Sequence, residues 1–295
     1  MTETIQTQAW KTQRSADSQL KRNWAKLRRN KAALFGGILI LIYLITALLA
    51  PVIFPGNPSA PNLSRSLERP SIEHPLGTDE LGRSILGRVV YGSRVSLLIA
   101  IGVVFVGLLV GVPLGLISGY YGGKVDFCIQ RITDTLLAFT GFLLALALVA
   151  VLGVGLKNTI ISVGISMVPI YIRLVRGCTL SVREQTYVEA AKAVGTRDRI
   201  ILIRHILPNV MAPITIQTSL GMGTAILFAA GLGFLGIGVQ PPTPEWGTML
   251  SSGRAYLFNA PHVATFPGIA IFLAVLGFNL AGDGLRDVLD PRFRL

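Results

Sequence analysis

The chain has 295 residues, of which 51% are hydrophobic and 14% are charged, and its formal net charge is +12. A soluble domain typically carries about 25% charged residues, so this composition excludes a disordered, collagenous or ordinary cytosolic protein. Two cysteines and three widely separated histidines also exclude a disulfide scaffold, an iron–sulfur cluster and a metal site with the usual ligand spacing. We therefore predict an integral membrane protein.

Six stretches are long and apolar enough to cross about 30 Å of hydrocarbon. They cover residues 32–54, 96–119, 130–152, 158–176, 210–238 and 263–282. The expected fold class is therefore all-α, with six transmembrane helices. We divide the chain into a basic N-terminal tail (1–31), a first helix with an extracytoplasmic segment (32–95), a five-helix core (96–284) and a C-terminal tail (285–295).

Lysine and arginine residues are distributed unequally between the two sides of the predicted membrane. Twenty of them fall on the side that holds the N-terminus and seven on the other side. Because cytoplasmic segments carry the excess of Lys and Arg, both termini are expected in the cytoplasm. The positive charge then suits anionic lipid headgroups. A nucleic-acid partner is not indicated, because the sequence has no basic stripe interleaved with aromatic residues.

Two segments beside the first span have the pattern of amphipathic helices. Residues 20–31 place apolar side chains on one face among basic ones, which suits a helix in the headgroup layer or a solvated basic stop. On the other side, Thr78 suits an N-cap for a helix over residues 79–92. That helix is expected to lie on the outer membrane surface.

The second span contains a ladder of glycines, each four residues from the next: Gly107, Gly111, Gly115 and Gly119. Residues at this spacing share one face of a helix, and glycines there allow a neighbouring helix to approach closely. We predict that this stripe is a helix-packing surface.

The ends of two other spans carry distinctive residues. Arg131 and Asp134, near the inner end of the third span, have the spacing of an intrahelical ion pair. Three prolines at 241, 242 and 244 forbid a helix after the fifth span, and Trp246 behind them suits the outer interfacial belt.

The chain lacks the residues that a transporter needs to obtain energy by itself. The nearest approach to a phosphate-binding loop, Gly123-Lys124-Val125, lacks the hydroxyl that would hold magnesium. The middles of the spans carry no charged residue, which disfavours a proton- or sodium-coupled carrier. Neither a catalytic set nor a cofactor site is predicted within this chain.

The inside loop over residues 177–208 is rich in charge and predicts two short helices. Tyr187, Ala190, Ala191 and Val194 share a face of the first helix, and Gly195 suits the left-handed residue that ends it. Thr196 suits the N-cap of a second helix that ends at Pro208. Such a compact protrusion suits either a helix docked in a partner's groove or a folded loop on the lipid surface.

At this point the sequence resembles a known family. Glu189-Ala190-Ala191, then Gly195, and later Leu207-Pro208 are similar to the EAA signature of ABC importer permeases, and His205 suits the peptide/nickel branch. His74-Pro75-Leu76-Gly77-Thr78-Asp79 and Gly282-Asp283-Gly284 strengthen this likeness. Over residues 22–295 the chain looks like the C-type permease subunit of dipeptide/oligopeptide importers.

The resemblance implies a type I ABC importer permease fold in a bacterial inner membrane. It also implies four kinds of partner: a second homologous permease, two cytoplasmic ABC ATPase subunits, an extracytoplasmic binding protein and the membrane lipids. ATP and magnesium would be bound by the ATPase subunits. The residues implied to couple this chain to them are Tyr187, Glu189, Ala190, Ala191, Gly195, His205 and Pro208.

Alternatives remain for the substrate and for the class of protein. The same type of importer carries nickel chelates, glutathione or opines, and no residue of this chain decides among them. A self-sufficient channel or secondary carrier, and a sensory or scaffold protein that binds an ATPase without transport, are the alternatives from other classes.

Overall fold

The structure is a computed structural model that describes residues 30–289, so the predicted interfacial helix at 20–31 lies almost entirely outside the described residues. Within this range the protein is helical and contains no β-sheet. Its helices are α2 (Lys31–Leu48), α3 (Ala50–Ile53), α4 (Ile85–Tyr121), α5 (Gly123–Leu137), α6 (Gly141–Leu152), α7 (Leu156–Arg183), α8 (Thr186–Ala193), α9 (Asp198–Ile200), α10 (Leu207–Phe234), α11 (Trp246–Gly253) and α12 (His262–Leu289). Short 3₁₀ turns cover Leu63–Arg65 and Arg254–Tyr256, and a π-helical turn covers Ile201–Ile206.

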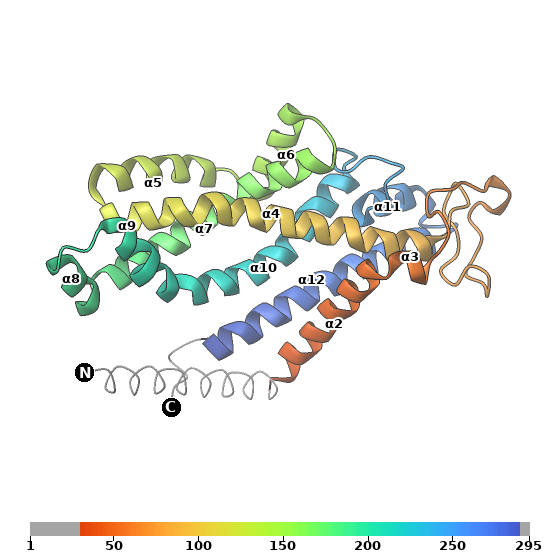
Figure 1. The fold of residues 1–295 in the computed structure, drawn as a ribbon. Helices are drawn as coiled ribbons and strands as arrows, with labels where there is room; N and C mark the ends of the chain where they lie inside the picture. The colour runs from red at the N-terminus through yellow and green to blue at the C-terminus, as the bar shows by residue number, and fades with distance from the viewer. Residues whose placement is uncertain (1–29, 290–295) are drawn as a thin grey trace.

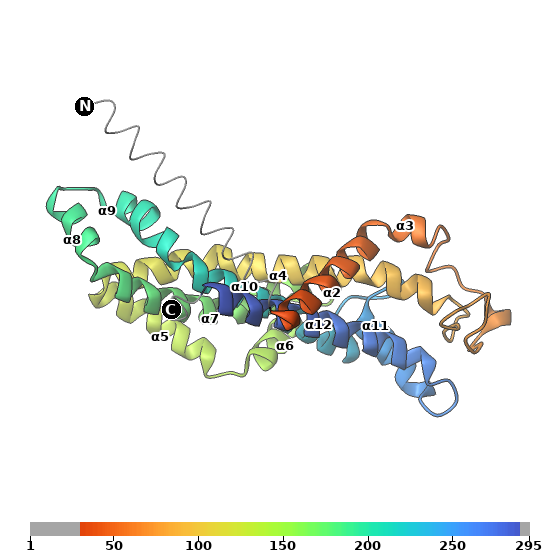
Figure 2. The ribbon, with the colours of Figure 1, turned by 90° about the horizontal axis from the view of Figure 1, so that it is seen from below.

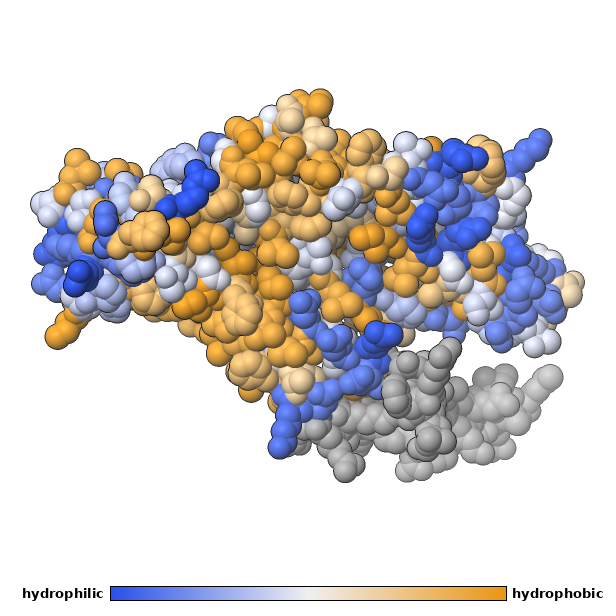
Figure 3. Space-filling model, turned by 180° about the vertical axis from the view of Figure 1, so that it is seen from behind, coloured by the Kyte–Doolittle hydropathy of each residue, from blue (hydrophilic) through white to orange (hydrophobic). Residues whose placement is uncertain are grey.

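The helices form an elongated bundle with one small unit at each end (Figures 1 and 2). At one end α8, α9 and the π turn form a unit that we call the knob (residues 184–206). At the other end lies the segment between α3 and α4, which we call the lobe (residues 54–84). Hydrophobic residues dominate the surface midway between the ends, and hydrophilic ones gather toward the ends (Figure 3). This distribution fits a bundle that crosses a membrane along its long axis.

The predicted all-helical membrane fold is confirmed, with one change in the spans. Among residues 30–289, five helical stretches are long and apolar enough to cross a membrane: α2, α4, α7, α12 and the continuous stretch from Asp198 to Phe234. The third predicted span, residues 130–152, is broken, because α5 and α6 are bent by 88° from each other. The polar side of α5 explains the break: it faces α4 and α7 and hydrogen-bonds to them. The ion pair predicted between Arg131 and Asp134 is also absent: Asp134 pairs with Arg173 of α7 at 2.7 Å, and Arg131 stacks on Phe127.

The glycine ladder lies against α7. A Cβ on Gly111 would come within 2.5 Å of the Tyr171 Cβ, and one on Gly115 within 2.7 Å of the Val175 Cβ. Gly107 and Gly119 meet Tyr171 and Thr179 in the same way. The backbone of α4 at these glycines therefore touches side chains of α7, and there is no room for a methyl group between them. This close contact makes α4 and α7 one packed unit.

We expect Gly111→Ala to lower the midpoint of thermal unfolding of the purified protein, because overpacking of a close contact costs about 1–3 kcal/mol. Gly37→Ala is the matched control, since a Cβ there meets nothing within 4 Å and alanine is the better helix former by up to about 1 kcal/mol. The control variant should unfold at the same temperature as the wild type or slightly above it. Equal midpoints for the two variants would contradict the assigned contact.

The lobe replaces the first half of the helix predicted over 79–92. Residues 79–84 form a turn, because the Asp79 carboxylate accepts hydrogen bonds from the backbone N–H groups of Leu81 and Arg83. Ser84, not Thr78, caps the helix: its side chain accepts from the Gly87 N–H at the start of α4. Thr78 instead donates its hydroxyl to the Arg65 carbonyl and so closes the lobe. The amphipathic pattern seen from Ile85 onward belongs to the first turns of the 37-residue α4.

Trp246, which follows the loop after α10, is buried, contrary to the prediction of an interfacial tryptophan. Trp246 is 0% exposed; its indole N–H donates to the Val89 carbonyl at 3.0 Å, and its ring meets Tyr43 edge-on. The prolines do not set the end of the span, since α10 ends at Phe234 before them. Glu245 precedes Trp246 and caps α11, because its carboxylate accepts from the backbone N–H groups of Gly247 and Thr248.

Glu245 predicts a specific pH dependence. Its carboxyl is 2% exposed, and burial raises its pKa from 4.5 to about 6 in spite of the two backbone N–H donors. The folded state therefore binds this proton more tightly than the unfolded state. This contribution of about 2 kcal/mol is present below pH 4.5 and is lost as the pH rises through 6.

The measurement is the difference between the unfolding midpoints at pH 5 and pH 8, compared for the wild type and Glu245→Gln. The glutamine cannot titrate, so the midpoint of the variant should change less with pH than that of the wild type. An identical pH difference in both proteins would contradict the raised pKa.

Candidate functional site

The knob is built on the end of α7. That helix ends at Arg183, and α8 begins at Thr186 after a link of two residues. Helix α8 ends in the left-handed residue that the sequence predicts: Gly195 has φ of 80°, its N–H donates to the Lys192 carbonyl, and the Thr196 N–H donates to the Ala191 carbonyl. This pair of hydrogen bonds is the Schellman arrangement. It fixes the sharp corner between α8 and α9.

A small apolar core attaches the knob to the bundle. Val188, Ile201 and Ile206 are fully buried, and they join a cluster with Val175 of α7 and Leu116 of α4. Burial of each such side chain contributes about 1.5–3 kcal/mol. The knob is therefore packed on the ends of α4 and α7 rather than lying loosely on the lipid surface.

Polar contacts to Tyr120, near the end of α4, strengthen this attachment. Its hydroxyl donates to Asp198 at 2.7 Å, and the Lys192 ammonium lies 4.9 Å from the centre of its ring. The Arg183 guanidinium donates to the carbonyls of Gly119 and Tyr120, which have no partner within the helix because α4 ends there. A force applied to the knob is thus applied directly to α4 and α7.

The face of α8 that the sequence singles out is turned toward solvent. Tyr187, Glu189 and Ala190 are exposed, and Val194 is 86% exposed although it is apolar. Ala191 is half-buried against the core of the knob. Arg197, Arg199 and Arg204 are exposed beside this face. The surface of the knob therefore combines an exposed apolar side chain, Val194, with exposed arginines, a composition that suits a protein partner.

The second half of the predicted loop differs from the structure. Arg197, not Thr196, occupies the N-cap of α9. The second helix does not end at Pro208 but continues through the π turn into α10. Proline is tolerated at that point because it lies in the first turn of α10, where its missing N–H breaks no regular α-helical bond. His205 is half-buried in the π turn, and its carbonyl accepts from Asn209.

Three residues that attach the knob were missed by sequence reasoning. Val188 is the buried anchor of α8, and Tyr120 and Arg183 come from the neighbouring helices. Val188 was the one visible signal, because its spacing of three residues from Ala191 is that of one face of a helix. The contacts of Tyr120 and Arg183 depend on the meeting of distant segments.

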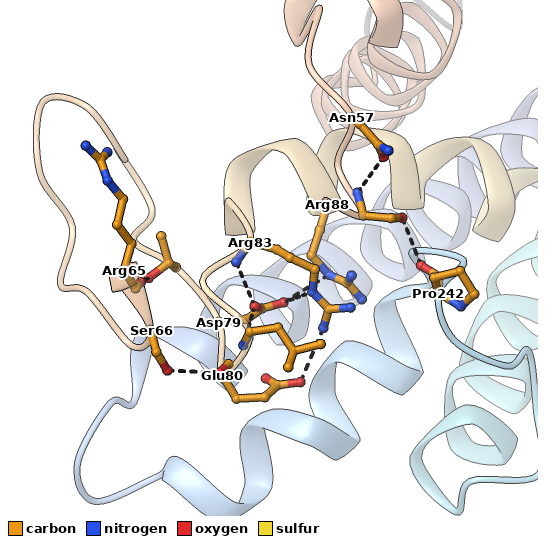
Figure 4. Close-up of polar contacts among 11 residues, drawn as sticks. Asn57, Arg65, Ser66, Asp79, Glu80, Arg83, Arg88 and Pro242 are labelled. Carbon is orange, nitrogen blue, oxygen red and sulfur yellow. Dashed lines mark hydrogen bonds and ion pairs between the residues drawn. The ribbon is translucent and has the colours of Figure 1, made fainter. Parts of the chain in front are cut away.

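The opposite end of the bundle carries a buried ion cluster (Figure 4). Asp79 lies between two arginines: its carboxylate is 2.7 Å from the Arg83 Nε and 3.4 Å from the Arg88 Nε. Glu80 contacts Arg83 at 3.3 Å. All three residues of the Asp79–Arg83–Arg88 group are at most 6% exposed. The cluster fastens the lobe to the start of α4.

The charged side chains at the two ends of the bundle form contacts within the protein or face solvent. Among residues 30–289, no group of three or more His, Cys, Asp or Glu side chains is placed to hold a metal ion. In the lobe, Arg65 pairs with Glu73 and Arg83 pairs with Asp79 and Glu80. The charged side chains of the knob point toward solvent or hold the knob in place. The arrangement suits a protein that binds partners and moves.

Comparisons with known proteins agree with this geometry. Residues 111–295 match the family described as binding-protein-dependent transport system inner membrane component, and residues 18–70 match the N-terminal TM domain of oligopeptide transport permease C. The dipeptide transport system permease protein of Alkalihalophilus pseudofirmus is 48% identical over 282 residues, which cover 96% of this chain and 93% of that protein. The glutathione transport system permease protein of Pectobacterium atrosepticum is 44% identical over 274 residues, or 92% and 90% of the two chains.

A solved structure shares the fold. An inward-facing conformation of the MetNI methionine ABC transporter superposes with a TM-score of 0.57 at 19% identity, covering 68% of this chain and 96% of that one.

Proposed function

The chain belongs to the family of binding-protein-dependent transport system inner membrane components, as a permease subunit of an ABC importer. From this premise we propose that it forms half of a pore for short peptides and that a partner drives it through the knob. The observation that carries the proposal is the knob itself. It presents an exposed apolar and basic face, yet its core joins it rigidly to α4 and α7. Such a unit suits the transfer of mechanical work from a separate ATPase.

Short peptides are the substrate class that the relatives favour. One of the two relatives named above is a dipeptide permease and the other a glutathione permease, and both substrates are short peptides with ionised ends. We therefore propose dipeptides or oligopeptides as the substrate, with glutathione as the alternative. An extracytoplasmic binding protein would supply most of the selectivity.

The excess of Lys and Arg supports a knob on the cytoplasmic side. Helix α2 begins and α12 ends beside each other, since the Asn30 side chain donates to Asp287 at 2.9 Å. The start of α2 and the end of α12 would then lie toward the cytoplasm, and the lobe would lie on the outer side of the membrane. Helix α2 also exposes a row of apolar side chains, which suits contact with lipid or with the second permease.

The test is reconstitution of this chain with its second permease, two ATPase subunits and the binding protein in liposomes. We expect uptake of a labelled dipeptide that requires ATP on the knob side and the binding protein on the lobe side. Glutathione, a nickel chelate and an opine are tested as competing substrates.

Two results would overturn the proposal. Uptake by this chain alone under an ion gradient would indicate a secondary carrier. ATPase binding without uptake of any of these substrates by the full set of subunits would indicate a scaffold or a sensor.

A further inference from the structure

Helix α5 is bounded by two sharp corners. At its start, Gly122 and Gly123 both have positive φ angles, of 65° and 53°, which few residues other than glycine adopt readily. At its end, the chain turns by 88° into α6. A helix between two such corners is able to change its angle to the bundle without breaking its own hydrogen bonds.

Polar contacts hold α5 against its neighbours. Within α5, Thr133 alone is fully buried, and most of its apolar side chains face outward. The Asp126 carboxylate receives two hydrogen bonds of 2.6 Å from the Arg176 guanidinium of α7. It also accepts from the hydroxyl of Ser118 in α4, which in turn accepts from the amide of Gln130 in α5. The position of α5 therefore depends on one central carboxylate.

The Asp126–Arg176 pair is partly shielded from solvent, with side chains 18% and 32% exposed. Bidentate pairs between arginine and a carboxylate have defined geometry and are stronger than single contacts. The second contact between α5 and α7, from Arg173 to Asp134, is a single hydrogen bond between side chains more than half exposed. The first pair is thus expected to fix the position of α5, and the second serves as a matched control.

Arg176 lies two turns before Arg183, which connects α7 to the knob. On its far side α5 continues into α6, where Ala145 and Val149 are buried in the main core and Phe142 packs on Phe228 of α10. A movement of α7 that carries α5 with it therefore acts on α6 from both sides, through the end of α5 and through the direct packing of α6 on α7. The Asp126–Arg176 pair lies where α5 is joined to α7.

We propose that Asp126 and Arg176 are positioning residues that bind α5 to α7, so that α5 moves together with the knob during the transport cycle. The proposal rests on the proposed function, because it assumes that a partner moves the knob. It goes further in assigning to a single ion pair the attachment of α5 to α7, beside the direct packing of α6 on α7.

The first test measures transport per ATP hydrolysed by the reconstituted importer. We expect Asp126→Asn, which keeps the shape of the side chain but removes its charge, to lower this ratio about tenfold, within the usual range of coupling free energies. Asp134→Asn should change it less than twofold. The double exchange Asp126→Arg with Arg176→Asp should recover part of the loss, which a purely steric role would not allow. Unchanged coupling in Asp126→Asn would overturn the proposal.

The second test measures the distance between α5 and α7 directly. Cys128 is exposed on α5, and Gly177→Cys in a Cys178→Ser background gives a site on α7 where a Cβ meets nothing within 4 Å. Spin labels at positions 128 and 177 should give one narrow distance that is the same in the nucleotide-free and ATP-trapped states. Asp126→Asn should broaden it.

A distance that changes between the two states while the ion pair is intact would contradict the proposal, as would an unchanged narrow distance in Asp126→Asn. The effect of Asp126→Asn on this distance is also measured in the nucleotide-free chain. If the importer neither binds an ATPase nor transports, the proposed function fails, and the label distance still reports whether Asp126 holds α5.

Discussion

Replacement of Asp79 by alanine is expected to destabilise the protein by about 3–5 kcal/mol, because it leaves two buried guanidinium groups without their shared carboxylate. Arg83 and Arg88 are 6% and 4% exposed, so water cannot replace the lost partner. The lobe would separate from the start of α4. The measurements are the unfolding midpoint of the purified protein and the amount of assembled importer in the membrane, and both should fall.

Glu73→Ala is the matched control for this prediction. The Glu73–Arg65 pair has the same 2.7 Å distance as the Asp79–Arg83 pair, but its side chains are 71% and 41% exposed. Exposed pairs contribute about 0–1 kcal/mol, so the control should be almost neutral. Asp79→Asn should fall between the two, since it keeps acceptors for the backbone N–H groups but loses the charge. Equal losses for Asp79→Ala and Glu73→Ala would show that burial is not the cause.

Val194→Asp is expected to reduce ATP-driven uptake by roughly 30-fold or more while leaving the chain folded and inserted. The side chain makes few contacts within the protein, since it is 86% exposed. Its backbone is in the ordinary right-handed helical region, so the substitution creates no strain. Loss of a central apolar contact in a protein interface costs about 2 kcal/mol or more, and a carboxylate placed in an apolar pocket adds a desolvation cost.

The control is Ile72→Asp, which changes a fully exposed apolar residue in the lobe and should leave ATPase binding intact. Gly195→Trp, the substitution that the sequence suggests first, tests the contact less cleanly, because the φ of 80° at this residue strains any side chain. The readouts are uptake and copurification of the ATPase subunits. Normal uptake by Val194→Asp would contradict the assigned contact.

The parts of the fold that were predicted from sequence are those set by local repetition. Runs of apolar residues located five of the helical stretches long enough to span, because their length alone satisfies the bilayer. The four-residue glycine spacing located the face of α4 that meets α7, since one period and one residue type define it. Gly195 located the end of α8, because a left-handed helix stop favours one residue type.

The parts that were not predicted depend on partners distant in sequence. Helix α5 is held against α7 by the contact of Asp126 with Arg176, fifty residues away, and it is bent by 88° from α6, so hydropathy alone gave one span. Trp246 is buried because Tyr43 and Val89 surround it, and both lie far from it in the chain. Asp79 prefers a turn to a helix because it binds Arg83 and Arg88 as well as nearby backbone N–H groups.

The most direct test of the central claim is a photo-crosslinking measurement at position 194 in intact cells. A photoreactive residue placed there should capture an ABC ATPase subunit, whereas the same residue at position 72 in the lobe should not. A cysteine placed at position 194 should also not react with membrane-impermeant thiol reagents added outside the cell. Failure to capture an ATPase from position 194, or labelling of this position from outside, would contradict the claim that the knob connects the permease to its source of energy.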